Sequence, residues 1–389
     1  MIELHRRHFL AASGAAAATG VQASVPALGT AHATRPAWRV LGIAPASQKL
    51  PTLATEYTRG VELGLAQSGA DVHVNWLSAG PLPSAQVKVI ESVLQQRKAD
   101  ALMGWIPPLL SKKLVPLAQK AGVPLWISDT GADLAEPSPA GASFARHTLE
   151  LCAVASALAD TVYAQCGPRA FLSLGWHESG YDLVQAFQDR WRSLGGQVTG
   201  RHIAGVPGQA HEFEDLKQAI VSRQPDVVVA LHSGPQAARF AQWWREQRPA
   251  LRTELAGFPW LAEHASTART VMSWPTADQA APGWAARFHQ AKLPWTAAAL
   301  LGAEAGASLG AALMNVSPGS SALWAGLQSR PLSGPRGERQ WAPAGNDSTG
   351  PLWERSVLHS QARQLQSANV TLSASAAARG GWTTGYFLT

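Results

Sequence analysis

Short apolar stretches of strand length alternate with helix-length amphipathic stretches along most of this chain, and this alternation restricts its fold more than any other feature. Trp38–Ile43 is a largely apolar run that predicts a buried strand. The following stretch, Thr55–Gln67, places Tyr57, Val61 and Leu65 on one helical face. Strands that alternate with helices in this way predict a parallel sheet with helices on both faces.

The alternation runs twice along the chain. In the first half we expect further strands at residues 72–76, 101–103 and 123–127, and helices at 84–94 and 111–120. The pattern restarts with strands at 170–174, 197–204, 226–231 and 254–257, and with helices at 181–194, 211–223 and 236–247. The sequence therefore predicts two similar α/β units joined near residues 144–148, and the tail from Ser317 predicts loops with short strands.

The first 33 residues have the pattern of an export signal. Arg6 and Arg7 stand together, an Ala/Gly-rich run follows, and Ala31-His32-Ala33 resembles a signal-peptidase site. Adjacent arginines followed by Phe9-Leu10 resemble a twin-arginine signal. We expect a periplasmic protein that is soluble after cleavage near Ala33. The alternative is a basic amphipathic start on a cytosolic protein.

Composition favours a globular protein without a nucleic-acid-binding surface. Removing 33 of 389 residues leaves 356, enough for two domains with their own cores. The formal charge is +6, but no run of five or six basic residues concentrates it, so we expect no nucleic-acid partner. Cys152 and Cys166 fall in or just past one predicted helix at 149–164. Fourteen helical residues separate them by roughly 20 Å, too far for a disulfide.

One apolar stretch, Thr296–Val316, is long enough to span a membrane and carries a single charge, Glu304. Its glycines Gly302, Gly306 and Gly310 have the spacing of a transmembrane helix dimer. Half of it is Ala and Gly, which contribute little transfer energy, and the central glutamate opposes insertion. The stretch therefore favours a buried helix of a soluble protein, packed closely against a sheet.

Six short segments identify a family resemblance by their order and spacing. They are Tyr57–Leu63, Gly122–Leu125, Phe144–Thr148, Leu194–Val198, Gln224–Val229 and Gly334–Gly337. In this order they resemble the leucine/isoleucine/valine-binding type of periplasmic solute receptor. The resemblance implies a type I periplasmic binding protein, in which two Rossmann-like lobes are joined by three crossovers and close over a ligand.

The resemblance also implies the partners and the domain bounds. We expect a small-molecule ligand, the permease membrane subunits of an ABC importer as partners, no cofactor, no metal and a monomer. One lobe is expected to contain residues 36–146 plus 275–335, and the other 149–272 plus 340–389. The crossovers are predicted near His147, Ser273 and Arg336.

Ligands of open α/β sheets bind beyond the carboxyl ends of strands. At those ends the sequence supplies Trp105, Pro108, Ser128, Asp129, Thr130, Trp176, Tyr181, His232 and Trp260. In the family that this chain resembles, the loops after the third and fourth strands hold a ligand carboxylate through hydroxyls and amides. Ser128 and Thr130 match the second of these loops, whereas Pro107 and Pro108 stand where hydroxyls are usual, and proline has no N–H to donate.

The resemblance fails at the residue that binds the ligand ammonium. Amino-acid receptors of the family carry an acid just after the strand that ends here at Gly257, and this chain has Phe258-Pro259-Trp260. An ordinary α-amino acid is therefore a doubtful ligand. Asp129 either replaces the missing acid from the opposite lobe or caps local backbone amides.

Tryptophan is unusually frequent, with 16 residues against four tyrosines. Trp105, Trp176 and Trp260 stand at predicted ligand loops, where they either stack on an aromatic, amide or cationic ligand or pack the core and the lobe interface. We predict that at least two of the three face the ligand.

No local catalytic signature is present, and we expect a protein that is not an enzyme. The sequence contains no G-x-S-x-G elbow, no phosphate-binding G-x-x-x-x-G-K-[ST] loop and no H-E-x-x-H pair. The alternatives to a transport receptor are a periplasmic ligand sensor of the same fold that signals to a membrane partner, and a hydrolase on a similar scaffold.

Overall fold

The computed structural model describes residues 37–79, 83–134, 144–209, 211–265, 268–314, 316, 331–342, 346–355, 362–365, 370–373, 381–382 and 385–388. The predicted export signal, residues 1–33 with Arg6 and Arg7, lies outside the described residues. Every structural statement below concerns the described part of the chain.

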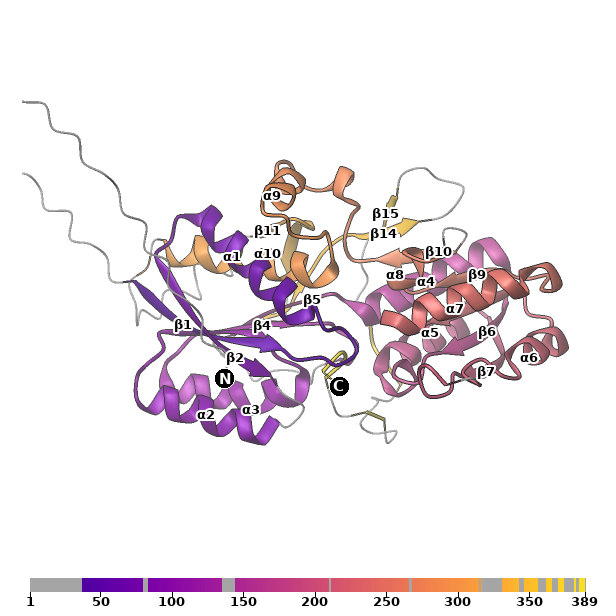
Figure 1. Ribbon diagram of the computed structural model, residues 1–389, viewed down its shortest axis with the longest axis horizontal. Coiled ribbons are helices and arrows are strands. Elements are labelled where there is room, and N and C mark those ends of the chain that lie inside the picture. The colour runs from indigo at the N-terminus through magenta and orange to yellow at the C-terminus, as the bar shows by residue number, and fades with distance from the viewer. Residues whose placement is uncertain are drawn as a thin grey trace, which may run out of the picture. The chain divides into compact units, whose positions relative to one another are not determined.

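The first lobe is built on a five-stranded parallel sheet. Its strands are β1 (Trp38–Pro45), β2 (Val72–Ala79), β3 (Ala101–Trp105), β4 (Leu125–Asp129) and β5 (Phe144–Thr148), in the order β2-β1-β3-β4-β5. Helices α1 (Leu53–Ser68) and α10 (Ala297–Leu313) cover one face, and α2 (Pro83–Gln95) and α3 (Pro108–Ala121) cover the other (Figure 1). Because all strands are parallel, their carboxyl ends share one edge of the sheet.

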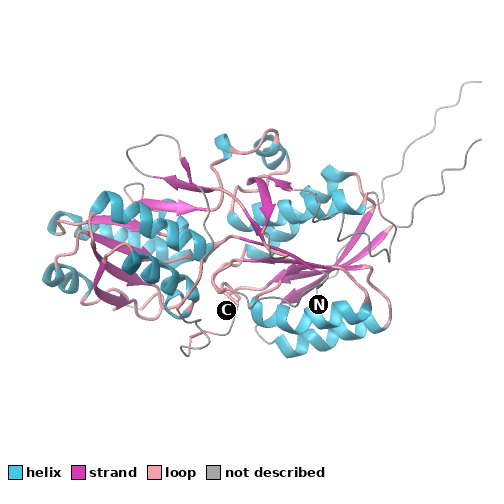
Figure 2. Ribbon diagram, turned by 180° about the vertical axis from the view of Figure 1, so that it is seen from behind, coloured by secondary structure: helices cyan, strands magenta, loops and turns pink. Residues whose placement is uncertain are grey.

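The second lobe is built on a seven-stranded sheet. Its order is β15-β14-β10-β9-β8-β6-β7, from β6 (Arg169–Leu174), β7 (Gln197–Ile203), β8 (Val227–Leu231), β9 (Glu254–Gly257), β10 (Arg269–Met272), β14 (Leu352–Arg355) and β15 (Arg363–Leu365). Strands β6 to β10 are mutually parallel, β14 pairs with β10 in the antiparallel sense, and β15 pairs antiparallel with β14. Figure 2 shows helices on both faces of this sheet.

Alternate residues of β8 separate the two faces of the second sheet. Val227, Val229 and Leu231 belong to the core beneath α4 (Leu151–Cys166) and α5 (Asp182–Ser193). Val228 and Ala230 belong to the core beneath α6 (Leu216–Arg223), α7 (Gly234–Gln247) and α8 (Pro259–Ala262). A continuous apolar run is therefore required, because both faces of the strand are buried.

A small antiparallel sheet lies beside the first lobe. It consists of β11 (Leu332–Gly334), β12 (Gly337–Trp341) and β13 (Ser348–Thr349), and Asp347 just before β13 bridges to Arg146 of β5. After this small sheet, the chain returns to the second sheet at β14, which pairs with β10. We therefore propose the third crossover at residues 350–351, later than the predicted Arg336, while the other predicted domain bounds stay proposals.

The remaining elements are short. They are helix α9 (Trp284–Gln290) and three 3₁₀ turns at Glu178–Gly180, Arg248–Ala250 and Ala277–Gln279. Sequence patterns placed the strands and helices of both units within a few residues of their observed bounds. Two differences are that α6 begins at Leu216 instead of His211, and that residues 144–148, predicted only as a join, form the edge strand β5.

The predicted buried helix at Thr296–Val316 is α10, and its glycines pack against helix α1 instead of the sheet alone. A Cβ atom at Gly302 would lie 2.2 Å from the Tyr57 carbonyl oxygen, and one at Gly306 would lie 2.1 Å from that of Val61. Only glycine permits this backbone approach. None of the helices in the described part of the chain has the length and apolar character needed to cross a bilayer. Cys152 and Cys166 are both free thiols, as predicted.

Candidate functional site

The polar candidates of the first lobe stand at the carboxyl end of β4 and bond mainly to their own lobe. The Ser128 hydroxyl accepts a hydrogen bond from the Tyr57 hydroxyl at 2.8 Å and lies 2.6 Å from Nε2 of His147. Thr130 Oγ1 accepts from the Ala132 amide at 3.3 Å. These groups fix the loop after β4, and their contact with a ligand stays a prediction.

Asp129 makes the local contact that was one of its two predicted roles. Its Oδ2 atom accepts from the Gly131 amide at 3.2 Å, as a turn-capping residue does. Burial raises the pKa of its carboxyl to about 6 against hydrogen bonds from the same loop. The Asp129 carboxyl is therefore more readily protonated than an exposed one. This weakens the hypothesis that Asp129 replaces the missing acid that binds the ligand's ammonium group.

Trp105 and Pro108 lie on either side of the loop after β3. Trp105 is the last residue of β3, is fully buried, and meets the ring of Tyr57 edge-on at 5.5 Å. Pro108 begins helix α3 and is half-buried. The Trp105 ring thus packs in the first lobe, and no described contact joins it to Trp260 or Trp176.

Of the four candidates of the second lobe, two share a contact and two lie apart from them. Trp176 is 47% exposed and lies 6.3 Å from the ring of Trp382. His232 is buried, bonds through Nε2 to the Ser173 hydroxyl at 3.0 Å and stacks on Phe240. Tyr181 and Trp260 are buried and each meets the ring of Tyr386, at 4.9 and 6.2 Å. The structure therefore gathers Tyr181 and Trp260 around one aromatic side chain.

A buried carboxylate that the sequence analysis missed stands at the centre of this group. Glu178, in the 3₁₀ turn after β6, is 0% exposed. Its Oε1 atom lies 3.0 Å from Nζ of Lys49, which follows β1 in the other lobe. The same oxygen accepts from the hydroxyls of Ser233 and, at 2.8 Å, Tyr386, while Oε2 is buried without a partner among the described residues.

The charges near Glu178 keep it ionised. Burial alone raises the pKa of this carboxyl, but the positive charge of Lys49 and the other neighbours outweigh it and hold the pKa below its usual value. Burial, with Lys49, lowers the pKa of His177 to about 4, and burial lowers that of His232 to about 4. At neutral pH the site therefore offers one ion pair, with a buried carboxylate and a half-buried ammonium, and two uncharged imidazoles.

The sequence did contain a signal for Glu178. The residue lies between Trp176 and Tyr181, in a loop selected because it follows a buried strand. Together with His177 it lacks the second histidine of an H-E-x-x-H zinc pair. Among the described residues, no group of three His, Cys, Asp or Glu could hold a metal ion. An acid is thus present in the second lobe, but it follows β6, two strands away in the sheet from β9, after which the family resemblance expects it.

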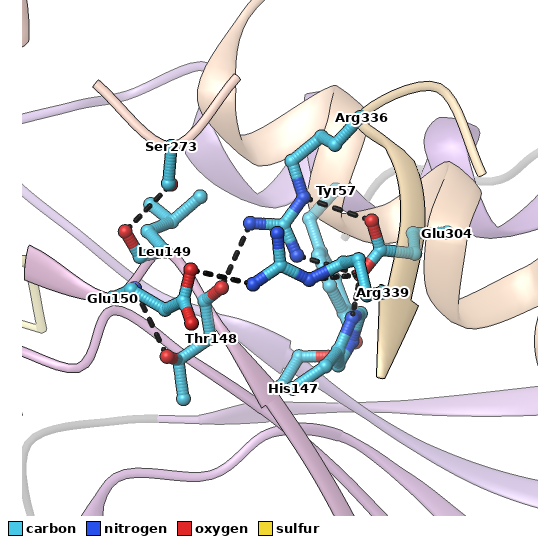
Figure 3. A network of polar contacts seen from close by, with 10 residues as sticks. Tyr57, His147, Thr148, Leu149, Glu150, Ser273, Glu304, Arg336 and Arg339 are labelled. Carbon is cyan, nitrogen blue, oxygen red and sulfur yellow. Dashed lines mark hydrogen bonds and ion pairs between the residues drawn. The ribbon is translucent and has the colours of Figure 1, made fainter. Parts of the chain in front are cut away.

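A second buried polar network lies at the end of β5 (Figure 3). Glu304 of α10 accepts from Arg336 through both oxygens, at 2.9 and 2.6 Å, and lies 2.9 Å from Nδ1 of His147. Arg339 lies 2.6 Å from Glu150 and 3.6 Å from Glu304. This cluster fixes the end of β5, and it consists of internal partners only.

The predicted crossover residues belong to this network. Ser273 donates to the Leu149 carbonyl at 2.6 Å, and Arg336 donates to the neighbouring Thr148 carbonyl at 2.8 Å (Figure 3). The segment after β5 is therefore held by residues that follow β10 and β11. These hydrogen bonds position the segment that follows β5.

A family model described as periplasmic binding protein matches residues 43–353. Among solved structures, a solute-binding protein of an ABC transporter from R. palustris in complex with benzoate is 21% identical, with a TM-score of 0.68 over 87% of this chain and 99% of the other. Leucine-binding protein LivK from Thermotoga maritima is 16% identical, with a TM-score of 0.64 over 85% and 99%.

LivJ from Streptococcus pneumoniae, solved with isoleucine, is 12% identical, with a TM-score of 0.65 over 85% of this chain and 100% of the other. Identities this low establish the fold alone, and they confirm the predicted two-lobed α/β architecture. The curated proteins include no match to this chain.

Proposed function

Because this chain belongs to the periplasmic binding protein family, we propose that it is the solute receptor of an ABC importer and captures a small organic solute between its two closing lobes. The observation that carries the proposal is the ion pair of Lys49 and Glu178. It brings charged side chains from the strand ends of both lobes to one buried point. A solute bound there contacts both lobes, as closure requires.

The side chains around Glu178 favour a planar ligand. The rings of Tyr181, Trp260 and His177 surround this position, and rings of this kind bind aromatic or other flat groups through their faces and edges. The similar structures include complexes with benzoate and with isoleucine. Of these two classes, we propose that the ligand is an aromatic acid or phenol and not a branched-chain amino acid. The absence of an acid after Gly257 supports the same choice.

The rest of the proposal concerns location and partners. We propose export by residues 1–33 through the twin-arginine route, a periplasmic, monomeric mature protein, and binding to the permease subunits of the importer. The family and the similar structures are binding proteins, which supports a role without catalysis. Replacing Arg6 and Arg7 by lysine is expected to reduce periplasmic yield, and an unchanged yield would exclude the twin-arginine route.

A thermal-shift panel tests the binding function. The panel contains benzoate, 4-hydroxybenzoate, leucine, isoleucine, an aliphatic amide and a cationic amine. A ligand at a hundred times its dissociation constant stabilises the folded protein by about 2.7 kcal/mol, and we expect the largest shift from an aromatic compound. Leucine as the tightest ligand would contradict the proposed ligand class. Loss of cellular uptake of the bound compound on gene deletion separates transport from sensing.

A further inference from the structure

The last described segment of the chain is buried at the proposed solute site. We call residues Gly385–Leu388 the C-terminal insert. Its side chains Tyr386, Phe387 and Leu388 are only 2%, 1% and 4% exposed. A short segment buried this deeply is held by specific contacts. The contacts of the insert are therefore informative about the site that holds it.

Two hydrogen bonds join the insert to the polar groups of the second lobe. The Tyr386 hydroxyl donates to Oε1 of Glu178 at 2.8 Å. The Phe387 amide donates to Nε2 of His177 at 3.3 Å. The insert thus occupies an acceptor on Glu178, a member of the interlobe ion pair, and another on the adjacent residue His177.

Aromatic contacts enclose the same segment. The Tyr386 ring meets Tyr181 edge-on at 4.9 Å and His177 at 5.1 Å. The Phe387 ring meets Trp260 edge-on at 5.1 Å. Both of the buried aromatic candidates predicted from the second lobe therefore face the insert.

The insert also touches the first lobe. A Cβ atom at Gly385 would lie 2.7 Å from Cβ of Pro107, so the backbone of the insert runs against the loop after β3. The insert therefore contacts loops that follow β3, β6 and β9, which are the loops where ligands of this fold class bind.

We propose that the C-terminal insert is a tethered competitor of the solute, with the Tyr386 phenol bound where a ring of the solute binds. This inference rests on the proposed function. The phenol donates to a carboxylate, so the site accepts a ring that carries a hydrogen-bond donor. A solute binds only to molecules whose insert has left, and its apparent affinity falls by the fraction of such molecules.

The test compares the full-length protein with a variant that lacks residues 385–389. Calorimetric titration with 4-hydroxybenzoate is expected to give a dissociation constant about tenfold or more lower for the shortened variant. A synthetic peptide with the sequence of residues 385–389 is expected to bind the shortened variant and not the full-length protein. A peptide with Phe in place of its tyrosine is expected to bind more weakly.

The full-length Tyr386→Phe variant tests the same proposal without deleting any residue. It removes only the donor to Glu178 and is expected to bind 4-hydroxybenzoate more tightly than wild type. Tyr163→Phe, at a half-buried tyrosine of α4 outside the site, is the matched control and is expected to leave the affinity unchanged.

The outcomes distinguish the competitor from the receptor function. Equal 4-hydroxybenzoate affinities in all variants, with no peptide binding, would overturn the competitor role and leave the receptor function standing. Peptide binding to the shortened variant, without binding of any small compound in the panel, would support the insert's site and contradict the proposed solute class.

Discussion

Glu304 and Glu178 are both fully buried carboxylates, yet their surroundings differ in kind. Glu304 is enclosed by Arg336, Arg339 and His147, so each of its oxygens has a fixed internal partner. Glu178 is held by Lys49 from the other lobe and by the C-terminal insert, and its second oxygen has no partner among the described residues. A charge with complete internal partners stabilises a fold, whereas a charge with replaceable partners is available to a ligand.

The largest expected effect on stability is at the network around Glu304. Replacing Glu304 by Gln leaves Arg336 buried without its carboxylate, while Arg339 keeps Glu150. Removal of one partner of such a network costs about 3–5 kcal/mol of unfolding free energy. Urea unfolding measures this loss. Glu62→Gln, at an exposed position of α1, is the control and is expected to change stability by less than about 0.5 kcal/mol. A Glu304→Gln variant as stable as the control would contradict the structural role that distinguishes Glu304 from Glu178.

The second effect concerns pH and the uncharged imidazole near Glu178. The pKa of His232 is lowered to about 4, so the unfolded chain binds this proton more readily than the folded protein. Stability contributed by the neutral imidazole is therefore present above pH 6.5 and is lost as pH falls toward 4. His232→Asn is expected to flatten this part of the curve, by up to about 3 kcal/mol.

Asp129 contributes to the pH dependence of stability with the opposite sign. Burial raises its pKa to about 6, so its ionisation between pH 4 and 6 lowers the stability of the folded protein. The comparison of His232→Asn with wild type cancels this contribution, since both proteins keep Asp129. A pH dependence of unfolding that is identical in the two proteins would contradict the assignment of a neutral His232.

A smaller effect is expected for ligand affinity at the aromatic part of the site. Trp260→Ala is expected to weaken binding of the best compound of the panel by about 1–3 kcal/mol, if measured in the shortened variant where the insert does not compete. Trp191→Ala, a buried tryptophan that stacks on Phe187 in the same lobe, tests for indirect effects. Equal losses in both variants would show that Trp260 only packs the core.

The sequence predicted the fold well because the signals of this fold are local. Apolar runs such as Val227–Leu231 are buried on both faces, so their composition alone marks them as strands of a covered sheet. The edge strand Phe144–Thr148 was missed, since Arg146 and His147 interrupt its apolar pattern. Their partners Asp347 and Glu304 stand far away in the chain.

The site was predicted only in part, because its contacts are not local. The strand-end rule selected Tyr181 and Trp260, which both lie beside Glu178's partner Tyr386. The hydrogen bond from Tyr386 to Glu178 joins residues 208 positions apart, and that from Lys49 joins residues 129 apart. No spacing or composition signal reports contacts of this range.

The central claim is that Glu178 belongs to the solute site, and one titration tests it most directly. In the variant that lacks residues 385–389, Glu178→Gln keeps the shape of the side chain and removes its charge. Calorimetry with the best compound of the panel is expected to show a loss of affinity of about tenfold, as for a lost charged hydrogen bond, with Glu62→Gln unchanged. An unchanged dissociation constant in Glu178→Gln would contradict the account.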